Sequence, residues 1–197
     1  LVGYEIPQLL AVLTVVSFLV ACGPKAPEKP KLPEKIVVGC LEPLTGAHAV
    51  FGTEAKIGME IAVRHINESG GIQSMGGIPL ELVVEDAGET ADSARLGAES
   101  IISKHRPVAI LGLYISRMTI AASEVTEREK VILVADALVD SVTQIGRRYL
   151  FRPAPKASQH GATAVEFVVA AAKEAGVSMN RVAILNEDSS FGRSNAI

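Results

Sequence analysis

The sequence predicts an α/β protein with a doubly wound parallel sheet, followed by the start of a second α/β lobe. Two observations carry this prediction. Short apolar runs alternate along the chain with segments of helical periodicity, which is the pattern of repeated βαβ units. The apolar runs are continuous rather than alternating with polar residues, as expected for strands that are buried on both faces of a parallel sheet.

The first βα unit begins with an apolar strand at residues 36–41. The period then changes, and residues 52–67 carry apolar side chains at helical spacing until Gly70 and Gly71 stop the helix. Cys40 lies near the end of the strand, where we interpret it as a small buried hydrophobic residue rather than a reactive thiol.

Further strands and helices follow in alternation. Strands are expected at residues 80–84, 108–111 and 131–135. The helix between the first two of these begins at Thr90 or Asp92, because both residue types fit an N-cap. The helix between the second and the third is expected to have Ser116 as its N-cap.

The pattern changes near residue 153. A strand-like run at residues 149–151 ends in Pro153 and Pro155, after which Ser158 is expected to open a long helix that stops at Gly176. Residues 181–185 read as another buried strand, followed by a polar loop.

These elements divide the chain into lobes. A single βα unit cannot cover both faces of its own sheet. We therefore interpret residues 36–153 as a first α/β lobe, and residues 154–197 as the incomplete beginning of a second lobe.

The N-terminal segment predicts the compartment. Residues 1–22 contain an apolar run that is too short to cross a bilayer as a helix, which needs ~20 residues, and that closes on Leu19, Val20, Ala21 and Cys22. This is typical of a lipoprotein signal in which Cys22 becomes lipidated and tethers the protein. An ordinary cleaved signal and an uncleaved anchor are the alternatives. The lipoprotein reading places the protein in the periplasm or on the outer face of the cell membrane.

Residues 23–35 follow as a spacer that is rich in Pro, Lys and Glu. Its prolines recur at every third position, which matches the three residues per turn of a polyproline II helix. The prolines are Pro24, Pro27, Pro30 and Pro33.

Composition and missing motifs exclude several classes of function. The formal charge of −3 gives no basic footprint for nucleic acid, and lipidation of Cys22 would leave Cys40 without a disulfide partner. No P-loop, dinucleotide-binding glycine motif or nucleophile elbow is present. We therefore expect no enzyme, no cofactor and no metal. The histidines show no metal-ligand spacing and are expected on the solvated surface; they are His48, His65, His105 and His160.

One segment carries binding chemistry on local grounds. Residues 112–116 lie at the carboxyl end of a predicted strand, where ligands bind in open α/β sheets. They lead into a helix whose free N–H groups and dipole favour an anion. Ser116 can add its hydroxyl, and this role is compatible with a plain N-cap. Tyr114 is a further candidate, whereas Arg117 could pair with a second acidic group but more simply lies on the surface.

Several motifs, in their order and spacing, resemble the type 1 periplasmic binding protein family, most closely its branched-chain amino-acid (leucine/isoleucine/valine) members. They are residues 43–46, 51–52, 66–72, 82–86, 110–112, Ser116, 151–152 and, after Asp188, 191–192. The resemblance covers essentially residue 36 to the end. It implies two α/β lobes that close around a small ligand, a transmembrane permease with ATPase subunits as partners, and no catalysis.

The resemblance also implies roles for single residues. Ser116 matches a serine that binds the ligand carboxylate, and Phe51 and Phe191 match walls on opposite sides of the ligand. In the loop after the fourth strand, Val139 replaces a threonine, so that Ala137 and Val139 can contribute only backbone groups.

Asp136 begins the same loop, at a position where the family usually has a proline or a glycine. It could bind a cation or merely cap a turn, and the sequence leaves both readings open.

The sequence thus predicts an extracytoplasmic solute-binding lipoprotein of an ABC importer. Its ligand is expected to be a small organic solute, an amino acid or another carboxylate or amide. A sensory or regulatory protein with the same fold is the alternative.

Overall fold

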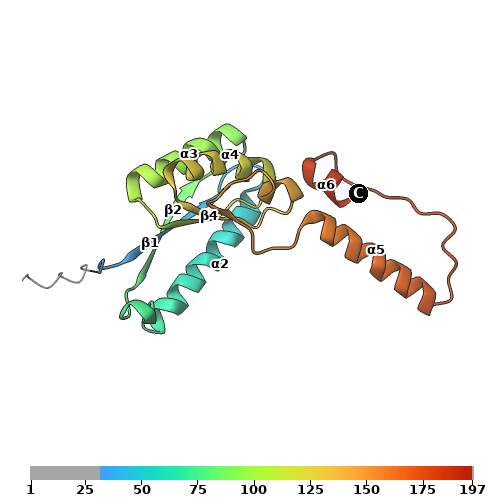
Figure 1. Ribbon diagram of the computed structural model, residues 1–197, viewed down its shortest axis with the longest axis horizontal. Coiled ribbons are helices and arrows are strands. Elements are labelled where there is room, and N and C mark those ends of the chain that lie inside the picture. Colours follow the sequence, from blue (N-terminus) through green and yellow to red (C-terminus); the bar gives the residue numbers. More distant parts are fainter. Residues whose placement is uncertain (1–31, 197) are drawn as a thin grey trace, which may run out of the picture. The chain divides into compact units, whose positions relative to one another are not determined.

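The computed structural model describes residues 32–196, so the predicted signal segment, Cys22 and most of the spacer lie outside the described residues. Five parallel strands form one sheet in the order β2-β1-β3-β4-β5 (Figure 1). Their bounds are β1 Ile36–Glu42, β2 Leu80–Asp86, β3 Ala109–Gly112, β4 Ile132–Val134 and β5 Leu150–Phe151. The predicted α/β class and the parallel sheet are confirmed.

Helices lie on both faces of the sheet. Helix α2 (Ala49–Glu68) packs on β1 and β2, and helices α3 (Ala91–His105) and α4 (Ser116–Glu129) pack together on the opposite face (Figure 1). The chain steps from β1 to β2 in one direction and from β2 across β1 to β3 in the other. Right-handed crossovers then require helices on opposite faces, which is the doubly wound arrangement.

The core lies between the sheet and the pair α3 and α4. Gly39 permits the close approach, because a Cβ there would lie only 2.8 Å from Cδ1 of Ile101. Cys40 is fully buried, as predicted, and its burial raises the pKa of its thiol to about 12. The largest buried apolar side chains are Leu41, Ile101, Ile110, Leu113, Met118 and Leu133.

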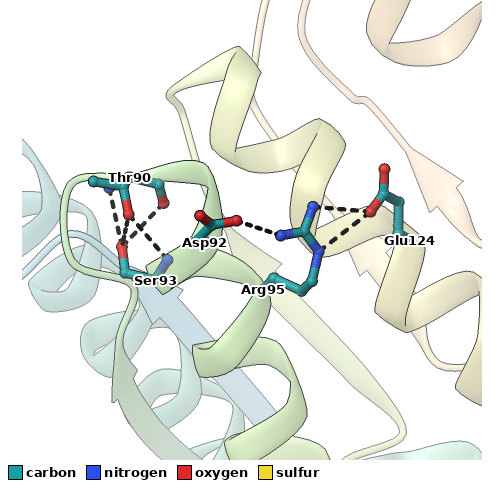
Figure 2. A network of polar contacts seen from close by, with 5 residues as sticks. All are labelled: Thr90, Asp92, Ser93, Arg95 and Glu124. Atoms are coloured by element: carbon teal, nitrogen blue, oxygen red, sulfur yellow. Dashed lines mark hydrogen bonds and ion pairs between the residues drawn. The ribbon is translucent and has the colours of Figure 1, made fainter.

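The start of α3 decides between the two predicted caps in favour of Thr90. The Oγ1 atom of Thr90 accepts the N–H of Ser93 at 3.0 Å, and the Oγ atom of Ser93 accepts the N–H of Thr90 at 2.9 Å (Figure 2). Asp92 instead pairs with Arg95, which also binds Glu124 and so connects α3 to α4 (Figure 2). These ion pairs are exposed and contribute little stability.

The prediction that Ser116 is the N-cap of α4 is wrong. Ser116 is the first helical residue, Ile115 is the N-cap, and no side chain caps this end. The backbone carbonyl of Ile115 accepts the N–H groups of Met118 and Thr119. The Oγ atom of Ser116 instead accepts the N–H of Val139, 23 residues later, at 3.4 Å.

Helix α5 (Ala157–Glu174) and the short helix α6 (Ser190–Asn195) follow the sheet. The start of α5 is close to the one predicted, and Ser158 binds Asp140, a residue of the 3-10 turn η2 (Asp140–Thr143). Helix α6 packs on α5, since a Cβ at Gly161 would lie 2.5 Å from the carbonyl oxygen of Asn195.

The predicted strand at residues 181–185 is not formed. Every side chain in this segment is exposed, and no strand within residues 32–196 pairs with it. A strand needs a neighbour for its N–H and C=O groups, and this segment has none among the described residues. Whether residues 154–197 begin a second lobe stays a prediction.

No helix within residues 32–196 combines the length and the hydrophobicity that crossing a bilayer requires.

Candidate functional site

A cavity of about 630 Å³ lies at the carboxyl ends of the strands. It lies next to the switch point between β1 and β3, where the chain order of the sheet reverses and where ligands bind in open α/β sheets. Its lining comes from the loops after β1, β3, β4 and β5, from the first turns of α2, α4 and α6, and from the segment before α6. These residues are His48, Phe51, Tyr114, Ile115, Ser116, Arg117, Asp136, Leu138, Ala154, Glu187, Ser189, Ser190 and Phe191.

The loop from β3 to α4 turns sharply before it reaches Ser116. Gly112 has a φ of 129° and Leu113 a φ of 66°, and the left-handed region is rare for a residue with a side chain. The carbonyl of Leu113 accepts the hydroxyl of Thr119 at 2.6 Å, which ties the turn to α4. The turn brings Tyr114 and Ser116 to the cavity.

Ser116 lies at the start of α4 and is only 7% exposed, yet it lines the cavity. Its Oγ atom accepts one hydrogen bond, from Val139, so its own hydroxyl hydrogen is free to donate. The first N–H groups of a helix have no partner within the helix, and they carry the positive end of its dipole. This end of the cavity can therefore bind an anion.

Successive side chains of the loop after β4 point in turn to the cavity and to the protein interior. Asp136 and Leu138 line the cavity, whereas Ala137 and Val139 are buried and are not part of the lining. Side chains of an extended chain point to opposite sides in turn. The side chains that line the cavity are therefore those of Asp136, which the sequence had offered as a candidate, and Leu138, which the alternation could have identified. Whether backbone groups of Ala137 and Val139 contact a ligand stays a prediction.

Arg152 holds the carbonyl groups of this loop. Its Nη1 atom donates to the carbonyl of Val139 at 2.9 Å and contacts those of Leu138 at 3.2 Å and Ala137 at 3.5 Å. Its Nη2 atom donates to the hydroxyl of Thr143 at 2.9 Å. The backbone carbonyls that the sequence offered to a ligand at Ala137 and Val139 are thus bound by the protein itself.

Aromatic rings form one wall of the cavity. The ring centroids of Phe51 and Tyr114 lie 5.7 Å apart, and those of His48 and Tyr114 lie 6.2 Å apart. His48 is half-buried with its ring beside Tyr114, so it is only partly solvated where a solvated surface histidine was predicted. Its ring joins the wall because residues 46–48 fold back on Glu89, whose carboxylate accepts the N–H of Ala47.

Phe191 lines the same cavity from the first turn of α6. Ser189 caps this short helix by accepting the N–H of Gly192 at 3.0 Å, and the cap positions the phenyl ring beside Glu187 and Ser190. The structure therefore brings together Phe51, Ser116 and Phe191, which the sequence had proposed from three distant segments.

Charged groups at the cavity carry both signs. Arg117 is exposed and donates from Nη2 to the carbonyl of Glu89 at 3.1 Å. Burial raises the pKa of the Asp136 carboxyl group, and burial together with the carboxyl groups of Glu42 and Asp136 raises the pKa of Tyr114. Within residues 32–196 no three His, Cys, Asp or Glu side chains group closely enough to hold a metal ion.

Glu42 is a residue that sequence reasoning missed. It ends β1 and is only 1% exposed. Burial, and after it the negative charge of Asp136, raises its pKa to about 8, so that it is mostly un-ionised at neutral pH. The feature of the sequence that could have identified Glu42 is a carboxyl group at the last position of a continuous apolar strand.

Comparison with known sequences finds relatives of this chain. Residues 35–196 match the sequence model of a family described as "Periplasmic binding protein". The chain is 34% identical over 163 residues to a Leu/Ile/Val-binding protein homolog 8 of Brucella abortus (strain 2308), a match that covers 79% of this chain and 39% of the relative. The chain thus spans well under half the length of that relative.

Solved structures show the same fold. A solute binding protein of an ABC transporter from R. palustris, in complex with 4-hydroxybenzoate, superposes with a TM-score of 0.67 at 26% identity, over 82% of this chain and 41% of that one. A branched-chain amino acid transporter substrate binding protein from Streptococcus pneumoniae, in complex with isoleucine, gives 0.58 at 27% identity, over 63% and 35%.

Proposed function

Because the chain belongs to the periplasmic binding protein family, we propose that it is part of the solute-binding protein of an ABC importer. It binds a small organic solute that combines a carboxylate with an apolar body, an amino acid being one such solute. The protein works outside the cytoplasm and is not an enzyme.

One observation carries the proposal. In a single cavity, the start of α4 with the Ser116 hydroxyl faces an aromatic wall that contains Phe51 and Tyr114, and Phe191 also lines the space. A helix N-terminus binds an anion, and apolar walls enclose the body of a ligand while a few polar groups fix its orientation.

The relatives support the carboxylate. The two solved proteins described above hold isoleucine and 4-hydroxybenzoate. These ligands differ in their apolar bodies and share a carboxylate group. In this chain the same cavity also carries Asp136, whose negative charge would favour an ammonium group on the ligand.

Delivery follows from the family. Ligand contacts to two lobes favour a closed state, which a transmembrane permease with ATPase subunits then accepts. Lipidation at Cys22 and the proline-rich spacer would tether the binding lobes to the membrane at a short distance. Mass spectrometry of the membrane fraction would detect the acyl chains, and a Cys22→Ser variant should be released from it.

The proposed binding of a carboxylate at Ser116 is tested by a pair of matched serine variants on α4. Ser116→Ala removes a hydroxyl in the cavity, whereas Ser123→Ala removes a buried hydroxyl that donates to the carbonyl of Ile120. We expect Ser116→Ala to weaken binding of a carboxylate ligand by ~1–3 kcal/mol in calorimetry, because a buried acceptor loses its donor. Ser123→Ala should leave the affinity unchanged.

A thermal-shift screen first identifies the ligand. It pairs acids with their amides: leucine with leucinamide, and 4-hydroxybenzoate with 4-hydroxybenzamide. Stabilisation by the acids alone is the expected result. Equal stabilisation by the amides, or equal affinity of Ser116→Ala and wild type, would show that no carboxylate binds at the start of α4.

A further inference from the structure

Glu42 lies behind the lining of the cavity, at the end of β1. β1 and β3 are paired with Leu41 beside Gly112, so Glu42 comes beside the left-handed turn that begins at Leu113. A Cβ at Gly112 would lie 2.9 Å from Oε1 of Glu42. The absence of a side chain at Gly112 therefore gives the carboxyl group its place under the turn.

The turn and the carboxyl group lie close together. Burial, and after it Asp136, favours the neutral form of Glu42, while the backbone N–H groups of Leu113 and Tyr114 favour the charged form. A residue such as Leu113 keeps a sparsely populated backbone conformation only where its surroundings determine it. Glu42 lies near the N–H groups of this turn, and the Thr119 hydroxyl donates to the carbonyl of Leu113.

Two buried polar atoms near this turn have no hydrogen-bond partner among the described residues. They are Oε2 of Glu42 and the hydroxyl of Tyr114. Buried polar groups are nearly always paired, and an exception calls for an explanation. Burial without a partner costs a neutral carboxyl group far less free energy than a charged one. The arrangement of Glu42 under the turn therefore depends on whether its carboxyl group holds a proton.

We propose that Glu42 is a positioning residue of this ligand site: through the turn at Leu113 and Tyr114, it couples one buried proton to the affinity for a carboxylate at the start of α4. The inference rests on the proposed function for the nature of the ligand. When Glu42 loses its proton, a negative charge arises behind a site that binds an anion. Affinity for the carboxylate then falls.

Other titratable groups surround Glu42 and set the pH at which this happens. Asp136 faces it from the loop after β4, and its removal should lower the pH of the transition because its negative charge raises the pKa of Glu42. The remaining groups act on Glu42 or on its neighbours, namely Cys40 on β1, Lys56 and Glu60 on α2, and Tyr114 and Arg117 in the β3–α4 segment.

The first arm of the test needs no ligand. Backbone amide NMR of the whole chain should show the resonances of Leu113 and Tyr114 shifting with a common midpoint near pH 8 in the wild type. Glu42→Gln should abolish this midpoint, and Asp136→Asn should move it to lower pH. If Glu42→Gln does not fold, the pH midpoints of the wild type and of Asp136→Asn are sufficient to test the proposal. The absence of a midpoint in the wild type would overturn the proposal.

The second arm measures affinity by calorimetry with benzoate and 4-methylpentanoate, acids with no other group that titrates between about pH 7 and pH 9. Wild-type affinity should fall about tenfold over this range, the order expected for one charge several ångströms away. The affinity of Glu42→Gln should stay constant, and an equal fall in both proteins would overturn the proposal. If neither acid binds at all, the carboxylate of the proposed function is wrong, while the NMR arm still decides the role of Glu42.

Discussion

At the scale of single residues, the cavity depends on groups that the protein binds for itself. Arg152 occupies carbonyl oxygens of the loop after β4, and the Oγ atom of Ser116 accepts a backbone N–H from the same loop. These contacts leave the loop with the Asp136 and Leu138 side chains facing the cavity. The groups that this loop presents to the cavity are therefore its side chains, because its backbone groups bind other parts of the protein.

Arg152 provides a test at this scale. Arg152→Lys keeps the charge but loses the planar fork that reaches the carbonyl of Val139 and the hydroxyl of Thr143 together. We expect a loss of about 1–3 kcal/mol in the free energy of unfolding, measured by urea denaturation, because part-buried carbonyl groups lose a charged donor. Arg148→Lys, at an exposed arginine whose guanidinium makes no hydrogen bond among the described residues, is the matched control. Equal stability of both variants would show that the fork does not hold the loop.

At the scale of the elements, the location of the site depends on how the N-terminus of each helix is capped. Helix α3 has a complete capping box, whereas α4 begins without a side-chain cap. Free N–H groups at the start of α4 are the reason that it suits an anion. Helix α5 is started by a distant group, because the Asp140 carboxylate accepts both the N–H and the hydroxyl of Ser158.

The link between η2 and α5 is tested by Asp140→Ala. Its loss should destabilise the first turn of α5 by about 0.5–2 kcal/mol, the usual value for a lost cap, and hydrogen exchange of residues 158–162 should become faster. The hydrogen bonds from Ser158 lower the pKa of Asp140. The stabilisation is therefore present at neutral pH and is lost as the pH falls through this lowered pKa. Unchanged exchange in the variant, or no dependence on acid in the wild type, would contradict the role of Asp140.

At the scale of the whole chain, burial is unevenly distributed. The face of the sheet under α3 and α4 holds the main core, whereas Phe151 on the other face of β5 is 52% exposed. Further along, Phe167 on α5 is 71% exposed, and residues 181–185 carry exposed apolar side chains. The sheet and the helices α3 and α4 thus share one core, and among the described residues none after Leu150 belongs to it.

Hydrogen exchange over the whole chain should reflect this distribution. Amides of β1 and β3 are expected to exchange slowest, since they lie in the middle of the sheet, and those of residues 181–185 fastest, since no strand pairs with them. Mass spectrometry of peptides after timed exchange measures both. Slow exchange at residues 181–185 in the 197-residue chain would mean that this segment is paired after all.

The sequence by itself determined the alternation of strands and helices, the fold class and the family, because apolar periodicity and the order of short motifs are local properties. It also identified Phe51, Ser116 and Phe191, which one cavity brings together, although their contact with a ligand stays a prediction. Tertiary structure decided the rest. The partner of the Ser116 hydroxyl, the choice of Leu138 over Val139 and the burial of Glu42 depend on which segments meet at the end of the sheet. The strand at residues 181–185 did not form because pairing needs a neighbour, and a neighbour is not encoded in the segment itself.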